Sequence, residues 1–351
     1  MSAPAPLAVV AAGEADAVRW DAFVERCPQA TFFHRYGWGR AARAAYGYET
    51  CDLMALRGGR VVGVLPLTDV RSLLFGRALV STAFATGGGP VAEDEEAHLA
   101  LAEAAIAAGR ARRARYVELR SRPVALDGWK VKSDVYAAFE GTIPADEEAH
   151  LKAIPRRRRA ELRKALALAA AGRLRARFDG DAEAFYRLYA RSLRDHGTPV
   201  FPRRFLDALL AQFSDAAEIM TVEADGRPTL SLLTFYFRER AIAYYVGATR
   251  AARALRAFDY AYWTQMRRAA ARGARVFDFG RSRVGSGSFA YKTHWGFAPQ
   301  PLDYQYALLA ARRTPNVSPA NPKFAVASAL WRRLPLAFAN AAGPALARRL
   351  A

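Results

Sequence analysis

Apolar and polar residues follow two periods along the chain, a period of two that is typical of strands and one of about 3.6 that is typical of helices. In the first half they predict a hairpin, then a helix, then a returning strand. These elements are strands at 53–56 and 61–67 around a Gly58-Gly59 turn, a helix at 95–108 and a strand at 114–119. Gly109 follows the helix, as is common at helix ends.

The same order of elements recurs in the second half. The matching elements are strands at 219–222 and 229–237 around an Asp225-Gly226 turn, a helix at 255–272 and a strand at 274–279. The two returning strands align at an offset of 160 residues, which sets Glu118 opposite Asp278. We therefore predict tandem copies of one α/β unit, with a chance likeness between short apolar segments as the alternative.

A strongly basic helix is predicted between the two copies, at 149–171. Apolar residues at helical spacing form one stripe of this helix, and cations cover the opposite face. The cations are Arg156, Arg157, Arg158, Arg159, Arg163 and Lys164, and Pro155 suits the first turn. Such a run is either a solvated face or a polyanion-binding surface. Its place at a domain junction favours binding of a nucleic acid.

The segment 276–297 joins an apolar strand to a glycine-rich, cationic loop. Asp278 lies among bulky apolar neighbours in the strand, which we expect to break at Gly280. Glycines allow close approach of the backbone to a ligand, and nearby cations neutralise its charge. We assign the anion-binding role to Arg281, Ser282, Arg283 and Tyr291, with Lys292 beside them. A solvated basic strand end is the alternative.

Composition narrows the class of protein. Lys and Arg number 52 against 33 Asp and Glu, a net charge of +19, which favours RNA, phosphorylated carriers or an anionic membrane as partners. A GC-rich genome would also produce an arginine excess. No apolar run reaches the roughly 18 residues of a membrane span, and no basic region precedes the apolar N-terminus. Two cysteines and five scattered histidines lack ligand spacing, so we expect a cytoplasmic protein without a metal.

The tail changes character near residue 312. Residues 312–322 are rich in Pro and Asn, and they end the second copy. An amphipathic helix is predicted at 323–334, and a shorter one follows Pro335. The tail either docks on the body of the protein, which we favour, or lies on the anionic inner face of the cytoplasmic membrane.

Together these features resemble the FemAB-like branch of the GNAT acyltransferase superfamily. The likeness is closest to the FemAB-related proteins found with exosortase/PEP-CTERM and exopolysaccharide loci. It rests on the tandem units, the basic helix and the motif FDFGRS…G.GSF.YK..WGF at 277–297. Further matching segments are HGTPVFPRRF at 196–205, LTFYFRERAIAYYVG at 233–247, FDYAYWTQMRRAAARG at 258–273, WGFAPQPLDYQY at 295–306, NPKF at 321–324 and WRRLPL at 331–336.

The resemblance implies an α/β (α+β) fold of tandem GNAT-like domains. Each domain is expected to contain a mixed, mostly antiparallel sheet flanked by helices. The expected boundaries are 1–150 for the first domain, 151–175 for the basic inter-domain helix, 176–310 for the second domain and 311–351 for a C-terminal helical tail.

The resemblance also implies N-acyl transfer onto an amine. In the characterised cell-wall branch, the donor is aminoacyl-tRNA and the acceptor is a peptidoglycan precursor. Lys292 falls on the family lysine that sits near the transferred acyl group and the tRNA end. The segment around Trp38, with Arg40 and Arg43, resembles one that contributes contacts to the acceptor phosphates. We add to the substrate site three further aromatic residues, Tyr244, Tyr245 and Trp263.

The chain departs from the acetyl-CoA-using relatives at 249–255. They carry a glycine-rich pyrophosphate loop there, whereas the sequence TRAARAL has no glycine. Acetyl-CoA is therefore disfavoured, and aminoacyl-tRNA or an acyl carrier remains as the co-substrate, with no permanently bound cofactor. The chain also lacks the long helical arm of some members. The expected partners are tRNA or an acyl carrier and a phosphorylated sugar or peptide precursor.

Acyl transfer requires a preorganised cation or N–H donor at the oxygen on which negative charge develops. Lys292 suits this role, and we expect its ammonium group to be exposed. Asp278 is either the base that takes the proton of the amine or a buried structural carboxylate bonded to the loop that follows it. Two other classes stay open: a non-catalytic anion- or RNA-binding protein, and a membrane-peripheral assembly factor of a polysaccharide/PEP-CTERM export system.

Overall fold

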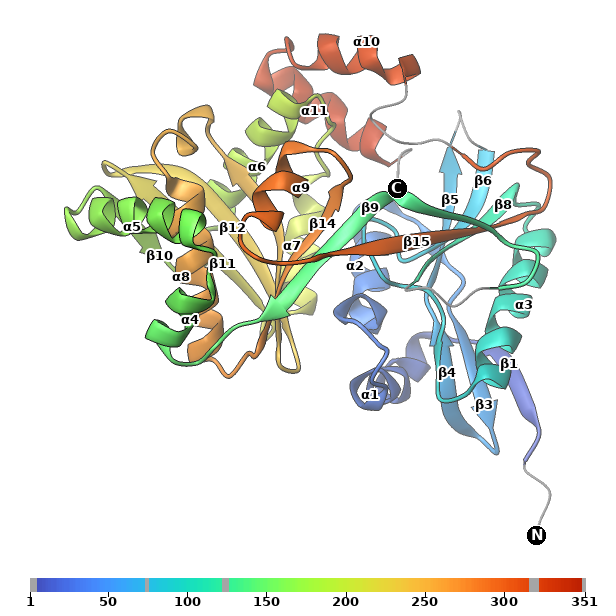
Figure 1. Cartoon of the computed structure of the whole chain (residues 1–351). Coiled ribbons are helices and arrows are strands. Elements are labelled where there is room, and N and C mark those ends of the chain that lie inside the picture. Colours follow the sequence, from blue (N-terminus) through green and yellow to red (C-terminus); the bar gives the residue numbers. More distant parts are fainter. Residues whose placement is uncertain (1–4, 73–75, 122–125, 316–321, 349–351) are drawn as a thin grey trace. The chain divides into compact units, whose positions relative to one another are not determined.

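The computed structural model describes residues 5–72, 76–121, 126–315 and 322–348 (Figure 1). The chain forms two compact units, and neither is one continuous stretch. Unit 1 is Met1–Val135, Pro301–Val317 and Arg348–Ala351, and unit 2 is Tyr136–Gln300 and Ser318–Ala347. Most of the Pro- and Asn-rich segment 312–322 lies outside the described residues, as does Asn321 of the predicted NPKF match.

In its described residues, unit 1 contains two sets of paired strands and three α-helices. In chain order its elements are β1 (Leu7–Ala11), α1 (Ala17–Arg26), α2 (Tyr36–Tyr46), β2 (Glu49–Thr50), β3 (Leu53–Arg57), β4 (Arg60–Leu65), β5 (Leu67–Ser72), β6 (Gly76–Ser81), β7 (Val91–Ala92), α3 (Glu95–Ala111), β8 (Tyr116–Ser121) and most of β15 (Pro299–Leu308). The strand orders are β1-β3-β4-β7 and β15-β8-β6-β5-β2. Among the described strand pairs of this unit, only β6 and β8, which α3 connects, are parallel. The core lies between α3 and the strands, around Leu101 and Val117.

In its described residues, unit 2 contains one set of paired strands with helices on both faces (Figure 1). Its elements are the second half of β9 (Lys130–Thr142), α4 (Glu147–Ala153), α5 (Arg156–Ala170), β10 (Leu174–Arg177), α6 (Ala182–His196), α7 (Arg203–Gln212), β11 (Ala217–Ala224), β12 (Arg227–Phe237), β13 (Arg240–Ala248), α8 (Ala257–Ala271), β14 (Val276–Arg283), α9 (Gly287–Thr293), α10 (Pro322–Trp331) and α11 (Leu336–Ala347). The strand order is β10-β11-β12-β13-β14-β9. Here α5 and α8 enclose the core around Met266 and Phe277.

The predicted repeat is confirmed in the strand pairing. In unit 2, β13 and β14 pair in parallel over three residues and end with Ile242 opposite Asp278. In unit 1, β6 and β8 pair in parallel over three residues and end with Val80 opposite Glu118. Glu118 and Asp278 therefore occupy equivalent positions, as the 160-residue offset predicts. The fold is the mixed, mostly antiparallel α/β fold that the sequence indicates.

Each unit is closed by a strand from the other half of the chain. In unit 1, β8 pairs with β15, which follows β14 in sequence. In unit 2, β14 pairs with β9, which follows β8. The units are consequently not the contiguous segments 1–150 and 176–310. The basic helix α5 and the tail helices also belong to unit 2 rather than to segments of their own.

Gly247 shows how closely a helix approaches the sheet of unit 2. A Cβ atom at this position would lie 2.2 Å from the backbone nitrogen of Tyr189, in α6. No side chain larger than hydrogen fits there, because the neighbouring atoms are backbone and have no alternative position. The glycine thus sets the distance between α6 and β13.

The prediction of one basic helix at 149–171 is wrong. The chain forms α4 and α5, separated at Ile154 and Pro155. Pro155 cannot donate a helical hydrogen bond, and it disfavours helical geometry at the residue before it. Ile154 is accordingly extended, with ψ 133°, and Pro155 becomes the N-cap of α5 rather than part of its first turn.

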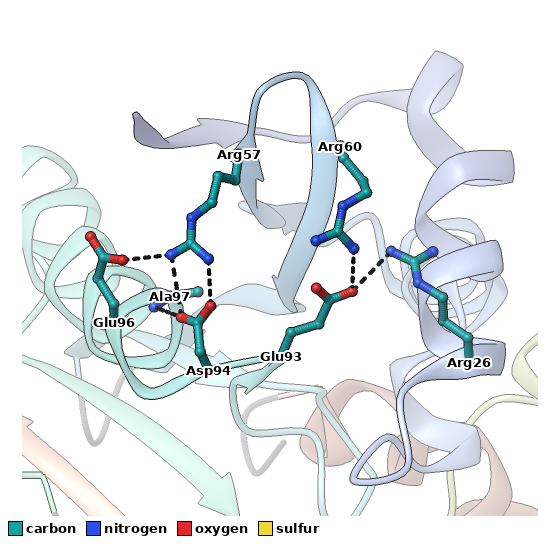
Figure 2. Close-up of polar contacts among 7 residues, drawn as sticks. All are labelled: Arg26, Arg57, Arg60, Glu93, Asp94, Glu96 and Ala97. Atoms are coloured by element: carbon teal, nitrogen blue, oxygen red, sulfur yellow. Dashed lines mark hydrogen bonds and ion pairs between the residues drawn. The ribbon is translucent and has the colours of Figure 1, made fainter. Parts of the chain in front are cut away.

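A cluster of ion pairs joins the β3–β4 hairpin of unit 1 to its helices (Figure 2). Arg57 pairs with Asp94 and Glu96 at the start of α3, with N–O distances of 2.6 and 2.5 Å. Arg60 pairs with Glu93 at 2.7 Å. Asp94 also caps α3, because its Oδ1 accepts the backbone N–H of Ala97 at 2.9 Å. Arg57, through its hydrogen bond, lowers the pKa of Asp94 below its ordinary value.

Asp94→Ala should lower the free energy of unfolding by about 1–2 kcal/mol, because it removes an N-cap and the partner of Arg57 together. Glu96→Ala is the matched control. It removes a pair whose carboxylate side chain is 69% exposed, and it should cost less than about 0.5 kcal/mol. Urea unfolding of the three proteins measures the difference. Equal losses in the two variants would mean that the cap contributes nothing.

Candidate active site

The candidate site lies where the parallel pairing of β13 and β14 ends. After Ile242 and Asp278, the register between β12 and β13 shifts between Leu233 and Thr234, which is the level of Tyr244 on β13. On β14 the register with β9 shifts between Asp278 and Arg281. Gly280, within this shift, has φ +68°, a left-handed conformation that favours glycine. The predicted break of the strand at Gly280 is wrong. Because β9 keeps pairing with β14, the strand continues to Arg283.

Lys292 is buried, which corrects the prediction of an exposed ammonium on a loop. It lies on α9, whose N-cap Ser286 accepts the backbone N–H of Phe289 at 3.2 Å. Its side chain points back to β14, where Nζ donates to the carbonyl oxygens of Gly280 at 2.9 Å and Arg281 at 3.0 Å. Burial lowers its pKa from 10.5 to about 8, although the charge of Asp278 opposes this. Lys292 thus fastens α9 to the irregular part of β14.

Asp278 is half-buried on the neighbouring part of the same strand. Its Oδ1 accepts the backbone N–H of Gly280 at 2.6 Å, which is a contact with the segment that follows it. Burial raises its pKa from 3.8 to about 6, and the negative charge of Glu140 adds to the effect. Gly280 N–H, Lys292 and Arg240 act in the opposite direction. At neutral pH the carboxylate is ionised and can accept a proton.

Two charged residues of this site were missed in the sequence. Glu140 faces Asp278 from β9, and Arg240 binds Glu140 with an N–O distance of 2.6 Å. They come from segments 100 residues apart, and only strand pairing brings them to Asp278. No local pattern could have indicated them.

The predicted anion-binding residues surround the same part of β14. Arg281 and Arg283 are exposed, and the guanidinium of Arg281 lies 4.6 Å from the ring centroid of Tyr136. Ser282 is buried between them, and its Oγ makes no hydrogen bond with any residue in the described ranges. The residues of this group therefore offer both charge and a hydroxyl at the strand end.

The predicted aromatic residues have different environments. Tyr244 lies next to Gly280, since a Cβ there would be 3.9 Å from its ring. Tyr245 packs instead against Tyr189, with ring centroids 5.4 Å apart. Trp263 is buried in the core, with its ring centroid 4.8 Å from that of His150. Tyr244 is the one of the three that borders the irregular part of β14.

The basic run of α5 divides into two kinds of residue. Arg156, Arg157 and Arg163 are exposed, and the exposed Lys164 pairs with Glu161 at 2.8 Å. Arg159 is half-buried, and it donates weakly to the carbonyl of Lys152. Arg156, Arg157 and Arg163 therefore form an exposed cationic face of α5.

Arg158 points inward and belongs to the interior of unit 2. Its guanidinium lies 4.3 Å from the ring centroid of Tyr291 and 4.8 Å from that of Trp295. It forms an ion pair with Asp259 of α8, and the hydroxyl of Tyr291 donates to the same carboxylate oxygen at 3.0 Å. Since Tyr291 and Trp295 flank Lys292 in sequence, this contact holds the segment that carries the lysine.

Three predicted acceptor-site residues lie in unit 1. Trp38 is buried, and its Nε1–H donates to the carbonyl of Ala83 at 2.9 Å. Arg40 pairs with Glu14, and Arg43 donates to Oγ1 of Thr50 at 2.5 Å. Within unit 1, all three make contacts that stabilise α2.

Unit 1 contains an internally neutralised counterpart of the Asp278 site. Glu118, at the equivalent position, accepts from Nε of Arg120 at 2.8 Å, and both side chains are buried. Arg120 also donates to the carbonyl of Ala85 at 3.0 Å. The signal in the sequence was an acid and a base two residues apart on one face of a strand. Chemistry with a titratable carboxylate is therefore better supported in unit 2.

Asp278→Asn should stabilise the protein in a pH-dependent way. The pKa of Asp278 is raised on folding, so between about pH 4 and 6 the folded chain holds more protons and wild-type stability falls as the pH rises. The variant should gain up to about 3 kcal/mol over wild type above pH 6, and nothing below pH 4. Urea unfolding at pH 4 and pH 7 measures it. A pH-independent difference would contradict the raised pKa.

Among the described residues, no group of His, Cys, Asp and Glu is arranged to hold a metal ion. Cys27 and Cys51 are buried free thiols. No helix in the described ranges is both long and apolar enough to cross a bilayer.

Comparison with protein families identifies part of the chain. Residues 156–293 match the family model described as an acetyltransferase (GNAT) domain. This range contains α5, the β13–β14 pair and Lys292. Within unit 2, residues 156–293 are therefore similar to a GNAT acetyltransferase domain. No curated protein sequence matches the chain significantly.

Solved structures share the fold along most of the chain. A crystal structure of FemX matches with a TM-score of 0.67 and 14% identity, covering 86% of this chain and 98% of that one. The C-terminal domain of a putative lysylphosphatidylglycerol synthetase from Agrobacterium fabrum matches with a TM-score of 0.55 and 16% identity, covering 84% and 92%. A tandem GNAT protein from the clavulanic acid biosynthesis pathway matches with a TM-score of 0.52 and 14% identity, covering 88% and 100%. At these identities the likeness concerns the fold, which is a tandem GNAT fold.

Proposed function

We propose that this tandem GNAT protein is an N-acyltransferase of the FemAB type. It moves an acyl or aminoacyl group from an activated donor to an amine on a cell-envelope or exopolysaccharide precursor. The observation that carries the proposal is the buried Lys292 ammonium, which is bonded to the carbonyl of Gly280 and interacts electrostatically with the Asp278 carboxylate where β13 and β14 stop pairing. The association with exosortase/PEP-CTERM loci rests on the sequence resemblance.

The proposed reaction is nucleophilic substitution at an ester or thioester carbonyl. The amine nitrogen forms a new bond to the carbonyl carbon, negative charge grows on the oxygen, and the donor oxygen or sulfur leaves with the bonding electrons. Lys292, mostly protonated at neutral pH, supplies positive charge for that oxygen. Asp278 accepts the proton that the attacking amine loses, since its pKa near 6 leaves it ionised at pH 7.

The residues before α8 favour a donor other than acetyl-CoA. A pyrophosphate at this turn needs free backbone N–H groups, but those of Ala252 and Leu255 already donate to Thr249 and Ala251 at 3.2 and 3.0 Å. Aminoacyl-tRNA or an acyl carrier is the donor that we propose.

The name of one fold relative supports transfer of an aminoacyl group to a phosphate-bearing acceptor. One of them is named as a putative lysylphosphatidylglycerol synthetase, whose product name denotes an amino acid joined to a phospholipid. At least one protein with this fold is therefore named for a product that contains an amino acid. The exposed arginines of α5 and the net charge of +19 suit phosphate-bearing substrates.

Single-turnover transfer assays test the proposal. Labelled aminoacyl-tRNA, acyl-loaded carrier protein and acetyl-CoA are each mixed with the protein and a primary-amine acceptor, and amide formation is measured by mass spectrometry. We expect an amide from one of the first two donors and little from acetyl-CoA. Amide formation from acetyl-CoA alone would refute the donor assignment. Amide formation from none of the three, with RNA still bound, would favour the non-catalytic RNA-binding alternative.

The exposed arginines of α5 should contribute to binding of single-stranded RNA ends. If Arg156, Arg157 and Arg163 each neutralise one phosphate, replacing all three with Gln should make the log–log salt slope less negative by about 2, at roughly 0.7 per phosphate. The matched control replaces three exposed arginines elsewhere in unit 2, Arg175, Arg187 and Arg191. Fluorescence anisotropy over a salt series gives the slopes. Equal slopes for the two triple variants would assign the run to a solvated face.

A further inference from the structure

The two tail helices are exposed although they carry almost no charge. Residues Pro322–Trp331 contain one charged residue, Lys323, and Leu336–Ala347 contain none. Four large apolar side chains of these helices are strongly exposed: Val326 at 70%, Leu330 at 60%, Phe338 at 58% and Leu346 at 39%. They are half of the eight large apolar residues exposed in the described part of the chain. A helix that is apolar all round is normally covered on every side.

Small residues, rather than large ones, hold the tail to unit 2. Ala339, Gly343 and Ala347 form the buried face of α11. A Cβ at Gly343 would lie 3.1 Å from the backbone of Val200, so this face packs closely beyond the end of α6 (Figure 1). Nη1 of Arg194, in α6, donates to the carbonyl of Leu334 at 3.3 Å. The larger apolar residues consequently remain on the outer side, which is the reverse of an ordinary surface helix.

The charge of the tail identifies what covers this outer side. Residues 322–348 contain no Asp or Glu, and their charged residues are all cations. Arg332 and Arg333, which lie between the two helices, are exposed, and Arg348 follows directly after α11. Apolar side chains flanked by arginines suit the interface of an anionic bilayer, where the former enter the acyl boundary and the latter meet the headgroups. A protein partner with an apolar groove would not require this exclusion of carboxylates.

We propose that α10 and α11 form a docking surface for an anionic phospholipid membrane. The helices lie in the plane of the interface, with Leu330 and Phe338 inserted and Arg332 and Arg333 at the phosphates. The surface brings unit 2 to a bilayer without a spanning segment. This inference stands on the tail alone and does not depend on the acyl-transfer chemistry.

Vesicle flotation of the full chain tests the proposal. We expect binding to vesicles of phosphatidylcholine mixed with phosphatidylglycerol, and much weaker binding to phosphatidylcholine alone. Leu330→Glu with Phe338→Glu should weaken binding by at least about 10-fold. The double variant removes two apolar side chains that would enter the membrane, and it adds negative charge. Arg332→Gln and Arg333→Gln should each weaken it by about five-fold.

Val18→Glu with Leu99→Glu is the matched control, because it changes two exposed apolar residues of unit 1, at 84% and 41% exposure. This control should bind like wild type, and melting temperatures of all variants show that they remain folded. Equal binding by the tail variant and the control would overturn the proposal. So would a wild-type protein that ignores anionic vesicles, or one whose dimerisation in analytical ultracentrifugation is lost in the tail variant, since the surface would then cover a second copy.

Discussion

Replacing Lys292 with Met should lower single-turnover acyl transfer by about 10²–10³, which is typical for loss of one electrostatic donor at a developing oxyanion. The substitution keeps most of the apolar stem and removes the ammonium. Lys152→Met is the matched control, since Lys152 is an exposed lysine of the same unit that pairs with Glu148 on one helix. The control should transfer at the wild-type rate. Wild-type activity in Lys292→Met would give the lysine a purely structural role.

The pH profile separates a chemical role of Lys292 from a structural one. If Asp278 must be ionised and Lys292 protonated, the rate should rise through about pH 6 and fall through about pH 8. Lys292→Met should remove the alkaline limb, and Asp278→Asn the acidic limb. A structural loss of activity would lower the rate at every pH and leave both limbs in place.

The stability of the Lys292→Met variant should also depend on pH. The pKa of Lys292 is lowered on folding, so between about pH 8 and 10.5 the unfolded chain holds more protons and wild-type stability rises with pH. Removal of the buried charge raises the free energy of unfolding of the variant relative to wild type, and this gain is fully present below pH 8. It should shrink by about 3 kcal/mol as the pH approaches 10.5. Urea unfolding at pH 7 and pH 10 measures this change, and a constant difference would contradict it.

Arg158→Gln should destabilise the protein by about 3–5 kcal/mol, because it leaves the buried Asp259 carboxylate without its counter-charge. The side chains of Arg158 and Asp259 are only 11% and 8% exposed. Arg156→Gln, two residues earlier on the exposed face of α5, is the matched control and should change stability by less than about 0.5 kcal/mol. Urea unfolding at pH 7 compares the two variants.

A double variant tests whether the loss comes from the unpaired charge. Arg158→Gln with Asp259→Asn removes both charges, and it should recover much of the stability that the single variant loses. A double variant as unstable as Arg158→Gln would instead attribute the loss to packing between Tyr291 and Trp295. Loss of less than about 1 kcal/mol in the single variant would show that Arg158 belongs to the solvated run.

The repeat could be predicted from the sequence because local patterns repeat. The pattern depends on residues that are close together in the chain. It includes the turns at Gly58-Gly59 and Asp225-Gly226, and the strand segments that recur at an offset of 160 residues. The tail helices and the position of Lys292 near a glycine-rich strand end were predictable for the same reason. The predicted break at Gly280 was wrong, because pairing with β9 extends β14 past Gly280.

What the sequence could not indicate depends on distant residues. A run of four arginines has the same appearance whether each one is solvated or buried. Only the location of Asp259 and Tyr291, about 100 and 130 residues later, turns Arg158 inward. The burial of Lys292 likewise depends on carbonyl groups of β14 that are exposed to it by a register shift. The unit boundaries were missed because β9 pairs with β14 of the second copy and β15 pairs with β8 of the first.

The crossed pairing of β9 and β15 has a consequence for how the protein is made. A ribosome delivers β8 early, but its partner β15 begins at Pro299, after nearly all of unit 2. Until then the edge of β8 has unpaired backbone groups, which invite pairing with another chain. Unit 1 is thus the first to emerge and cannot be completed first, so the two units mature together near the end of translation.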